Sequence, residues 1–314
     1  MKNIKFYIGA CICFCASMLF AQEQTTYKQG EIIELWTKDT IPDNISAKAE
    51  TLTGKMHRRW RRNVSNPRLE FFKANTGKKT GIVIVCPGGG YGGLSADNEG
   101  YSIAQWVVEH GMNAAILWYR VPDNMNGALQ DIQRAIRMIR AKADNLNVDA
   151  DKICVIGFSA GANLCARAST RFNVNAYKPV DAIDKLSARP SHTCLIYPAY
   201  CDEPNYRSCK LVGDGKNQQY DDYNSTYKLA DNLLVSKDTP PAFIVQTLAD
   251  KKYVNSSIAY YLALKKAEVD ANLFVCDKGP HGYGLGYRNP QDLVSMWPQI
   301  FDKWLTINKF KGDK

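Results

Sequence analysis

Short runs of β-branched and other apolar residues alternate along the chain with longer segments in which apolar positions recur every three or four residues. A short continuous apolar run is typical of a strand buried on both faces of a parallel sheet, whereas the longer period is typical of an amphipathic helix. The runs predict strands at Leu69–Lys73, Ile82–Cys86, Asn113–Arg120, Ile153–Ile156, His192–Tyr197, Ala242–Thr247 and Leu273–Cys276. The periodic segments predict helices at Glu99–His110, Ala128–Asn145, Ala162–Thr170, Asn224–Val235, Ser256–Val269 and Gln291–Lys309. This alternation predicts an α/β fold with a doubly wound, mostly parallel sheet and helices on both faces.

The N-terminus has the pattern of a secretory signal. Met1–Tyr7 contains two lysines, Ile8–Phe20 is apolar, and Ala21 offers a small residue for cleavage. About 13 apolar residues are too few to cross a bilayer as a helix, which disfavours a membrane anchor. We therefore expect residues 1–21 to be a signal peptide. The protein would then be exported, to the periplasm or beyond, with no membrane insertion once the signal is removed.

The remaining residues suggest one arm and one domain. Residues 22–62 are polar apart from an apolar patch at Ile32–Trp36, and we expect them to form an extended N-terminal arm. Residues 63–314 show no internal repeat and no linker, so we expect a single catalytic domain. Within it, the stretch 199–235 is polar, aromatic and contains glycine, which makes it the best candidate for a lid or specificity insert.

Composition and charge change this picture little. The 314 residues are 45% hydrophobic and 23% charged, as in ordinary globular proteins. The formal net charge of +9 is diffuse except for the basic run His57–Arg62. Such a run could bind nucleic acid or an acidic polymer. An exported protein meets little nucleic acid, so we expect no nucleic-acid partner and a solvated segment in which some arginines pair with acidic neighbours.

Cysteine usage argues against a metal centre. Three of the ten cysteines lie in the predicted signal, and the seven that remain are an odd number, so at least one thiol is unpaired. Cys86, Cys154 and Cys276 lie in strand-like runs and are expected to be small core residues. Cys201 and Cys209 flank a polar loop and are the best candidates for a disulfide. Neither a Cys-x-x-Cys pair nor a histidine cluster has zinc-site spacing, and we expect no metal or cofactor.

The strongest chemical signal is the sequence Gly157-Phe158-Ser159-Ala160-Gly161, which lies between a predicted strand and a predicted helix. A serine hydroxyl attacks a carbonyl only if it projects from the backbone into a cleft, and a sharp strand-to-helix turn places it so. Glycines two residues before and two after leave room for the tight crossing. The alternative, a glycine-rich strand end with an idle serine, is disfavoured by this context. We predict that Ser159 is a nucleophile.

A serine nucleophile needs a base. His57 lies in the basic run, His110 precedes a glycine that ends a helix, and His192 opens a strand. His281 follows the last predicted strand, in a glycine-rich loop that could place an imidazole over the strand ends. We therefore predict His281 as the general base, in preference to a structural loop histidine.

The base in turn needs a carboxylate to fix its tautomer. Asp250 ends the strand that begins at Ala242 and lies between Ser159 and His281 in sequence. Its alternative role is that of a turn or helix-capping residue. Asp277 is the nearest competitor, but it lies early in its loop. The order Ser, Asp, His is that of α/β-hydrolases.

The tetrahedral intermediate needs two N–H donors aimed at its oxyanion. One should be the backbone of Ala160, the residue after the nucleophile. The other should come from the glycines that follow the strand Ile82–Cys86, with Gly89 or Gly90 the best candidates. This loop could instead bind phosphate, but it lacks the Gly-Lys-Ser/Thr ending of a P-loop.

These positions resemble the esterase branch of the α/β-hydrolase superfamily that includes bacterial acetylxylan esterases and feruloyl-esterase-like carbohydrate esterases. The matching segments are Asn63–Pro67, Cys86–Tyr91, Glu99–Gly100, Leu117–Arg120, Leu129–Asp131, Gly157–Gly161 and Gly279–Gly282. The resemblance implies an α/β-hydrolase fold, with Ser159 as nucleophile, Asp250 as acid, His281 as base, and an oxyanion loop at Gly89 and Gly90.

Other family positions remain open. Pro87 stands where many relatives have histidine. Tyr91 could line the acyl pocket or pack on the loop. Glu99 and Arg120 are expected to pair structurally.

The function expected from these features is that of an exported serine esterase that removes acetyl or other small acyl groups from an acylated oligo- or polysaccharide. The same three side chains would also serve a feruloyl or aryl esterase, or a peptidase of related fold. A non-catalytic glycan-binding protein is a further alternative, although the presence of the three residues argues against it.

Overall fold

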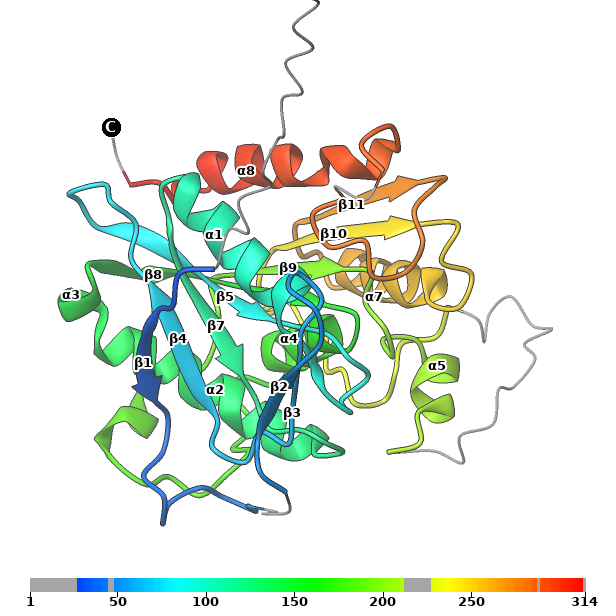
Figure 1. The fold of residues 1–314 in the computed structure, drawn as a ribbon. Helices are drawn as coiled ribbons and strands as arrows, with labels where there is room; N and C mark the ends of the chain where they lie inside the picture. The colour runs from blue at the N-terminus through cyan, green and yellow to red at the C-terminus, as the bar shows by residue number, and fades with distance from the viewer. Residues whose placement is uncertain (1–26, 45–47, 212–226, 287–288, 313–314) are drawn as a thin grey trace, which may run out of the picture.

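The structure, a computed structural model, describes residues 27–44, 48–211, 227–286 and 289–312. Among these residues the centre is an eight-stranded sheet in the order β1-β4-β7-β5-β8-β9-β10-β11 (Figure 1). Its strands are β1 (Glu31–Glu34), β4 (Arg68–Phe72), β5 (Thr80–Cys86), β7 (Asn113–Trp118), β8 (Val148–Phe158), β9 (His192–Ile196), β10 (Ala242–Thr247) and β11 (Ala271–Cys276). From β7 to β11 in this order the strands are parallel, whereas β4 is antiparallel to β7 and β1 is antiparallel to β4. The predicted doubly wound, mostly parallel sheet is confirmed.

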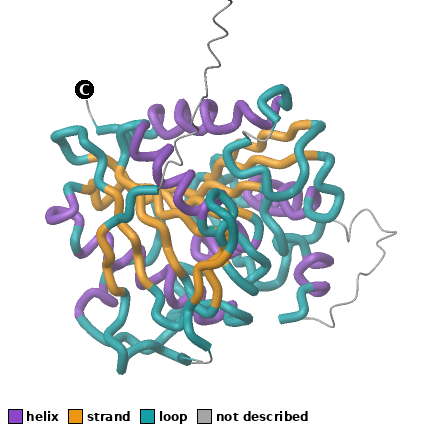
Figure 2. Tube along the Cα trace, viewed as in Figure 1, coloured by secondary structure: helices purple, strands orange, loops and turns teal. Residues whose placement is uncertain are grey.

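Helices cover both faces of this sheet, as Figures 1 and 2 show. On one face α1 (Ser102–Glu109) lies against α8 (Trp297–Ile307), where Trp106 stacks on Phe301 with ring centroids 6.2 Å apart. On the other face are α2 (Met125–Ala141), α4 (Ala160–Thr170) and α7 (Val254–Lys266). The shorter helical elements are α3 (Ala143–Leu146), α5 (Glu203–Ser208), a π-helical turn at Asp97–Tyr101, and 3-10 turns at Ala182–Lys185 and Leu293–Met296.

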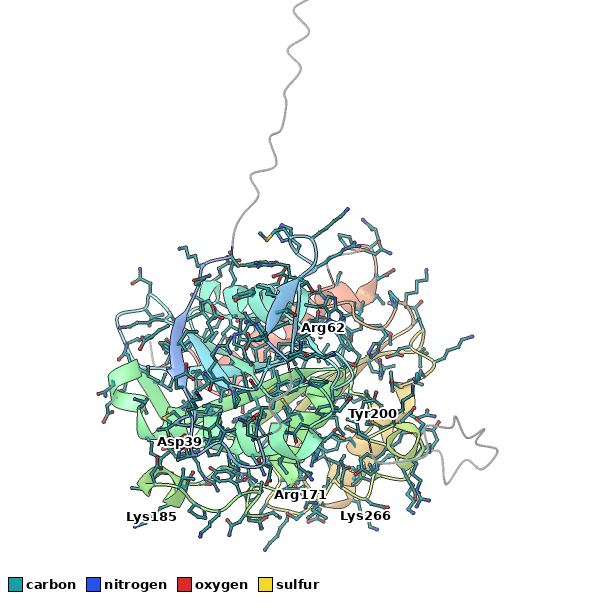
Figure 3. The ribbon with its side chains drawn as sticks, turned by 60° about the horizontal axis from the view of Figure 1, so that its bottom comes forward. Asp39, Arg62, Arg171, Lys185, Tyr200 and Lys266 are labelled. Carbon is teal, nitrogen blue, oxygen red and sulfur yellow. The ribbon has the colours of Figure 1, made fainter. Side chains whose placement is uncertain are left out.

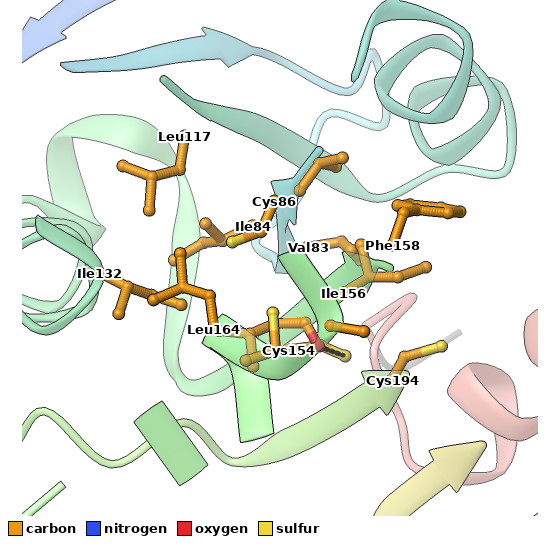
Figure 4. Packing of buried hydrophobic residues seen from close by; sticks show 14 of the residues in the cluster. Val83, Ile84, Cys86, Leu117, Ile132, Cys154, Ile156, Phe158, Leu164 and Cys194 are labelled. Carbon is orange, nitrogen blue, oxygen red and sulfur yellow. Dashed lines mark hydrogen bonds between the residues drawn. The ribbon is translucent and has the colours of Figure 1, made fainter. Parts of the chain in front are cut away.

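Coverage from both sides explains why the central strands read as continuous apolar runs. Every residue of β5 and of β7 is buried. Figure 4 shows Ile132 of α2 and Leu164 of α4 packed against this part of the core. Each large aliphatic side chain buried in this way contributes about 1.5–3 kcal/mol of transfer free energy. Cys86, Cys154 and Cys276 are buried among them, as predicted.

The segment predicted as an N-terminal arm packs on the domain. β1 forms the edge of the main sheet, with Ile33 opposite Leu69 of β4. Further along, β2 (Thr51–Thr53) and β3 (Trp60–Arg62) join β6 (Leu94–Ser95) in a small antiparallel sheet. The apolar patch Ile32–Trp36 is buried at its last residue, Trp36, whose indole donates a hydrogen bond to Asp131.

The basic run is held largely by acidic and aromatic partners. Arg59 forms an ion pair with the buried Asp97 at 2.8 Å, and Arg61 pairs with Glu50. The guanidinium of Arg62 lies 5.7 Å from the ring centroid of Trp60. The prediction that some of these arginines pair with acidic neighbours is confirmed.

Three details differ from the sequence-based expectation. The described residues 227–235 form no helix, whereas a helix was expected over Asn224–Val235. The rest of that range, and residues 212–226 of the candidate insert at 199–235, lie outside the described residues. The helix expected from Glu99 begins as a π-helical turn. The predicted disulfide is wrong, because Cys201 and Cys209 are both buried free thiols at opposite ends of α5.

The predicted signal peptide, residues 1–21, also lies outside the described residues. Within the described ranges, every helix is too short or too polar to traverse a lipid bilayer.

Candidate active site

Ser159 lies at the sharp turn between β8 and α4. Its backbone has φ 53° and ψ −117°, a conformation that is strained for any residue with a Cβ. The two flanking glycines make the turn possible. A Cβ on Gly157 would overlap the carbonyl oxygen of Gly161, and a Cβ on Gly161 would overlap that of Cys86. The strand and helix therefore cross too closely for any side chain at these two positions.

The structure brings together the three side chains that the sequence singled out. His281 Nε2 lies 2.8 Å from Ser159 Oγ, and His281 Nδ1 lies 2.6 Å from Asp250 Oδ2. Asp250 follows β10 and His281 follows β11, so all three stand beyond the carboxyl ends of parallel strands. The Asp250 side chain is 4% exposed and that of His281 is 33% exposed. The carboxylate is thus shielded from water, while the imidazole faces an open space.

The rejected candidates have structural partners. Asp277 accepts a hydrogen bond from the N–H of Lys278, at the start of its loop. The other three histidines bond to neighbours as well: His57 to the Tyr27 hydroxyl, His110 to the carbonyl of Trp106, and His192 to the Asn308 side chain.

The glycine loop after β5 reaches the serine from the other side. Gly89 and Gly90 have φ values of 141° and 62°, which favour glycine, and both line the cavity that contains Ser159. The N–H of Gly88 is not free to bind an oxyanion, because it donates to Glu99 Oε2 at 2.7 Å. Ala160 begins α4 directly after the serine, at the positive end of that helix. This arrangement is compatible with the predicted oxyanion donors at Gly89 or Gly90 and Ala160.

A buried hydrogen-bond chain connects this loop to the loop of His281. Glu99 accepts from the Gly88 N–H through one oxygen and from the Tyr197 hydroxyl through the other, at 2.9 Å. The Tyr197 oxygen in turn accepts from the N–H of Gly284 at 3.1 Å. Burial, followed by the nearby Glu99 charge, raises the pKa of Tyr197 well above its usual value, so the hydroxyl keeps its proton. The chain therefore holds the two loops at a fixed separation.

Sequence reasoning missed this chain, and the expected pairing of Glu99 with Arg120 was wrong. Arg120 forms its buried ion pair with Asp131 at 2.8 Å, whereas the two carboxylate oxygens of Glu99 bond to the glycine loop and to Tyr197. Tyr91, for which two roles were left open, is buried, and its hydroxyl donates to Asn163 of α4 at 2.8 Å. The only sequence signal for the chain was Glu99, an acidic residue eleven positions after Gly88, and nothing in the pattern indicated Tyr197.

The cavity around Ser159 has a volume of about 390 Å³. Aromatic rings border it, with Tyr253 5.0 Å from the His281 ring centroid. It is lined by Trp60, Gly89, Gly90, Ser95, Asn98, Glu99, Ser159, Tyr200, Tyr253, His281 and Gly282. Trp60, Asn98 and Tyr253 were not among the predicted site residues. Over the described ranges, no three His, Cys, Asp or Glu residues are grouped so that they could hold a metal ion.

Comparison with known proteins relates this chain to esterases. The sequence profile of the BD-FAE family matches residues 70–264. The acetylxylan esterase of Xylanibacter ruminicola is 29% identical over 217 residues, which are 65% of this chain and 41% of that protein. The endo-1,4-beta-xylanase B of Butyrivibrio fibrisolvens is 32% identical over 228 residues, 69% of this chain and 34% of that protein. The chain therefore spans less than half the length of these curated relatives.

Solved structures are similar over much more of their length. The acetyl ester-xyloside bifunctional hydrolase of Caldicellulosiruptor lactoaceticus is 30% identical with a TM-score of 0.72, over 90% of this chain and 98% of that one. A carboxylesterase of Lactobacillus plantarum, 22% identical, has a TM-score of 0.62 over 85% of this chain and 99% of that one. The second likeness supports the fold alone.

Proposed function

The chain belongs to the BD-FAE family and has the α/β-hydrolase fold, and from this premise we propose that it is a serine carboxylic ester hydrolase that removes acetyl or other small acyl groups from carbohydrate. The observation that supports the chemistry is the hydrogen-bonded series from Asp250 through His281 to Ser159. A serine, a histidine and a buried carboxylate in this order are the parts that acyl transfer requires.

The proposed reaction has two halves. His281 Nε2 takes the proton of Ser159 as its oxygen attacks the ester carbonyl, and the oxyanion is stabilised by the N–H of Ala160 and one from Gly89 or Gly90. Protonated His281 then gives its proton to the sugar oxygen, which leaves, and the acyl group remains on Ser159. A water molecule loses a proton to His281 and attacks the acyl-enzyme, and His281 then returns that proton to Ser159 Oγ as the bond to the serine breaks and the carboxylic acid leaves.

Asp250 acts through the histidine throughout. Its carboxylate accepts the Nδ1–H of His281, which leaves Nε2 unprotonated and pointing at the serine. The same contact stabilises the imidazolium that forms in each half of the reaction. The low exposure of Asp250 strengthens this interaction, because little water competes for the charge.

The carbohydrate class rests on the relatives. One similar protein is named an acetylxylan esterase and another an acetyl ester-xyloside bifunctional hydrolase. The cavity is open enough for a sugar ester and is bordered by aromatic and polar side chains together, the mixture expected for a sugar site. We place the enzyme outside the cytoplasm, on the evidence of the predicted signal at residues 1–21; N-terminal sequencing of the mature protein tests this.

Release of acetate from acetylated xylan tests the proposal. Wild-type protein should release acetate, and Ser159→Ala should release none above the rate of the buffer. Parallel assays with feruloyl esters and dipeptides separate the other reactions that the same three residues could perform. The proposal fails if wild type releases no acetate, or if Ser159→Ala releases as much.

A further inference from the structure

We propose that Trp60 is a stacking platform for the sugar ring whose ester is cleaved, so that the N-terminal segment, outside the residues matched by the family profile, builds the sugar subsite. This inference rests on the proposed function, and it adds a binding residue and its ligand, a pyranose ring of the acylated glycan.

The first observation is position. Trp60 lines the cavity that contains Ser159 and His281. A Cβ built on Gly89 would lie 2.9 Å from Cζ3 of the Trp60 ring. The indole therefore lies against the loop that is proposed to bind the oxyanion. A sugar whose ester carbonyl occupied that loop would have its ring within reach of the indole.

The second observation is exposure. Trp60 is 37% exposed, whereas Trp36, Trp106, Trp118 and Trp297 are at most 6% exposed. An indole left open to solvent forgoes favourable burial, and at the wall of a cavity it offers an apolar surface to a ligand. The C–H-rich face of a pyranose suits such a surface, because its weakly positive hydrogens are attracted to the negative face of the aromatic ring.

The third observation is that the ring is held in place. Trp60 is in register with Ser95 of β6 and with Thr53 of β2. The N–H of Ser95 donates to the carbonyl of Gly88 at 2.9 Å, so the small sheet is tied directly to the glycine loop. Trp60 is also in contact range of Arg62, whose guanidinium carbon lies 5.7 Å from the ring centroid. A platform fixed in this way loses little conformational entropy when a ligand binds.

Polar groups complete the subsite. Ser95 and Asn98 line the same cavity, and Tyr200 lines it from the loop after β9. In Figure 3 the labels of Arg62 and Tyr200 mark the two segments, β3 and the loop after β9, that border the cavity. Hydroxyl and amide groups beside an aromatic platform can bond to sugar hydroxyls, which a purely apolar acyl pocket would not need.

The test measures selectivity between two acetate esters. One is acetylated xylotetraose; the other is ethyl acetate, whose leaving group is too small to cover the indole. For Trp60→Ala, the ratio of kcat/KM for the oligosaccharide ester to that for ethyl acetate should fall at least about tenfold, as for a central aromatic contact. Trp60→Phe keeps a smaller ring and should lose less. Leu52→Ala, at an equally exposed position of the same small sheet (38%), should leave the ratio unchanged.

Three results would overturn the inference. The first is an unchanged ratio in Trp60→Ala, whether neither rate falls or both fall by the same factor; an equal fall would indicate a structural role. A rise in ethyl butyrate hydrolysis relative to ethyl acetate would instead place Trp60 in the acyl pocket. The third result concerns the substrate class. Wild type would cleave ethyl acetate but not acetylated xylotetraose, and calorimetry would detect no binding of acetylated xylotetraose to Ser159→Ala. The proposed substrate class would then fail, and the subsite would fail with it.

Discussion

Replacement of Tyr197 by phenylalanine removes the middle link of the hydrogen-bond chain between the glycine loop and the His281 loop. The lost hydroxyl donates to Glu99 at 2.9 Å and accepts from the N–H of Gly284 at 3.1 Å. Gly284 is buried, so its N–H would lose a partner that water cannot readily replace. A buried donor left without a partner costs about 1–3 kcal/mol.

This cost should appear both in stability and in rate. In a domain of this size 1 kcal/mol lowers the thermal midpoint by roughly 2 °C, so Tyr197→Phe should unfold roughly 2–6 °C below wild type. Activity should fall as well, because His281 and the oxyanion loop are no longer held at one separation. Circular dichroism during heating measures the first effect, and kcat for ethyl acetate measures the second.

Tyr283 provides a matched control within the same cluster. Its ring lies 4.4 Å from that of Tyr197, and it too is buried. Its hydroxyl, however, has no hydrogen-bond partner among the described residues. Tyr283→Phe removes an unpaired polar atom and should leave the midpoint unchanged or raise it. Equal losses in the two variants would show that the hydrogen bonds of Tyr197 are not what stabilises these loops.

The remaining predictions concern the acid, the turn and the thiols. Asp250→Asn should keep its thermal midpoint but lose about 10⁴-fold in kcat, because the amide favours the wrong histidine tautomer; activity within tenfold of wild type would remove Asp250 from the mechanism. Gly161→Ala should give little soluble protein, because the added Cβ overlaps the carbonyl oxygen of Cys86; a wild-type yield and midpoint would contradict the close crossing. Thiol titration of denatured, unreduced mature protein should find seven free thiols, and a count of five would restore a disulfide such as Cys201–Cys209.

The local pattern of apolar residues was sufficient to predict the class of fold. The apolar runs of β5 and β10 and the periodicity of α2 identify their elements because burial on two faces and burial on one stripe leave different sequence periods. The turn at Ser159 was predictable for a similar reason, since its glycines are required by a contact between neighbouring elements. His281 and Asp250 could be chosen because each follows a strand whose end points to the same edge.

Contacts between distant segments could not be read in this way. The hydroxyl of Tyr197 meets Glu99 across 98 residues, and no local period reflects such a bond. The position of Trp60 at the cavity could not be predicted, because the arginines on either side of it in sequence suggested a solvated surface. The disulfide was wrongly predicted because two cysteines that flank a polar stretch look adjacent in sequence, whereas a helix separates them in space.

The most direct test of the central claim is whether Ser159 is the nucleophile that His281 activates. Wild-type protein treated with a fluorophosphonate should gain one label, and mass spectrometry of its peptides should locate that label on Ser159. Ser159→Ala should remain unlabelled, and His281→Gln should label far more slowly. A label on another serine, or equal labelling of Ser159→Ala, would contradict the account.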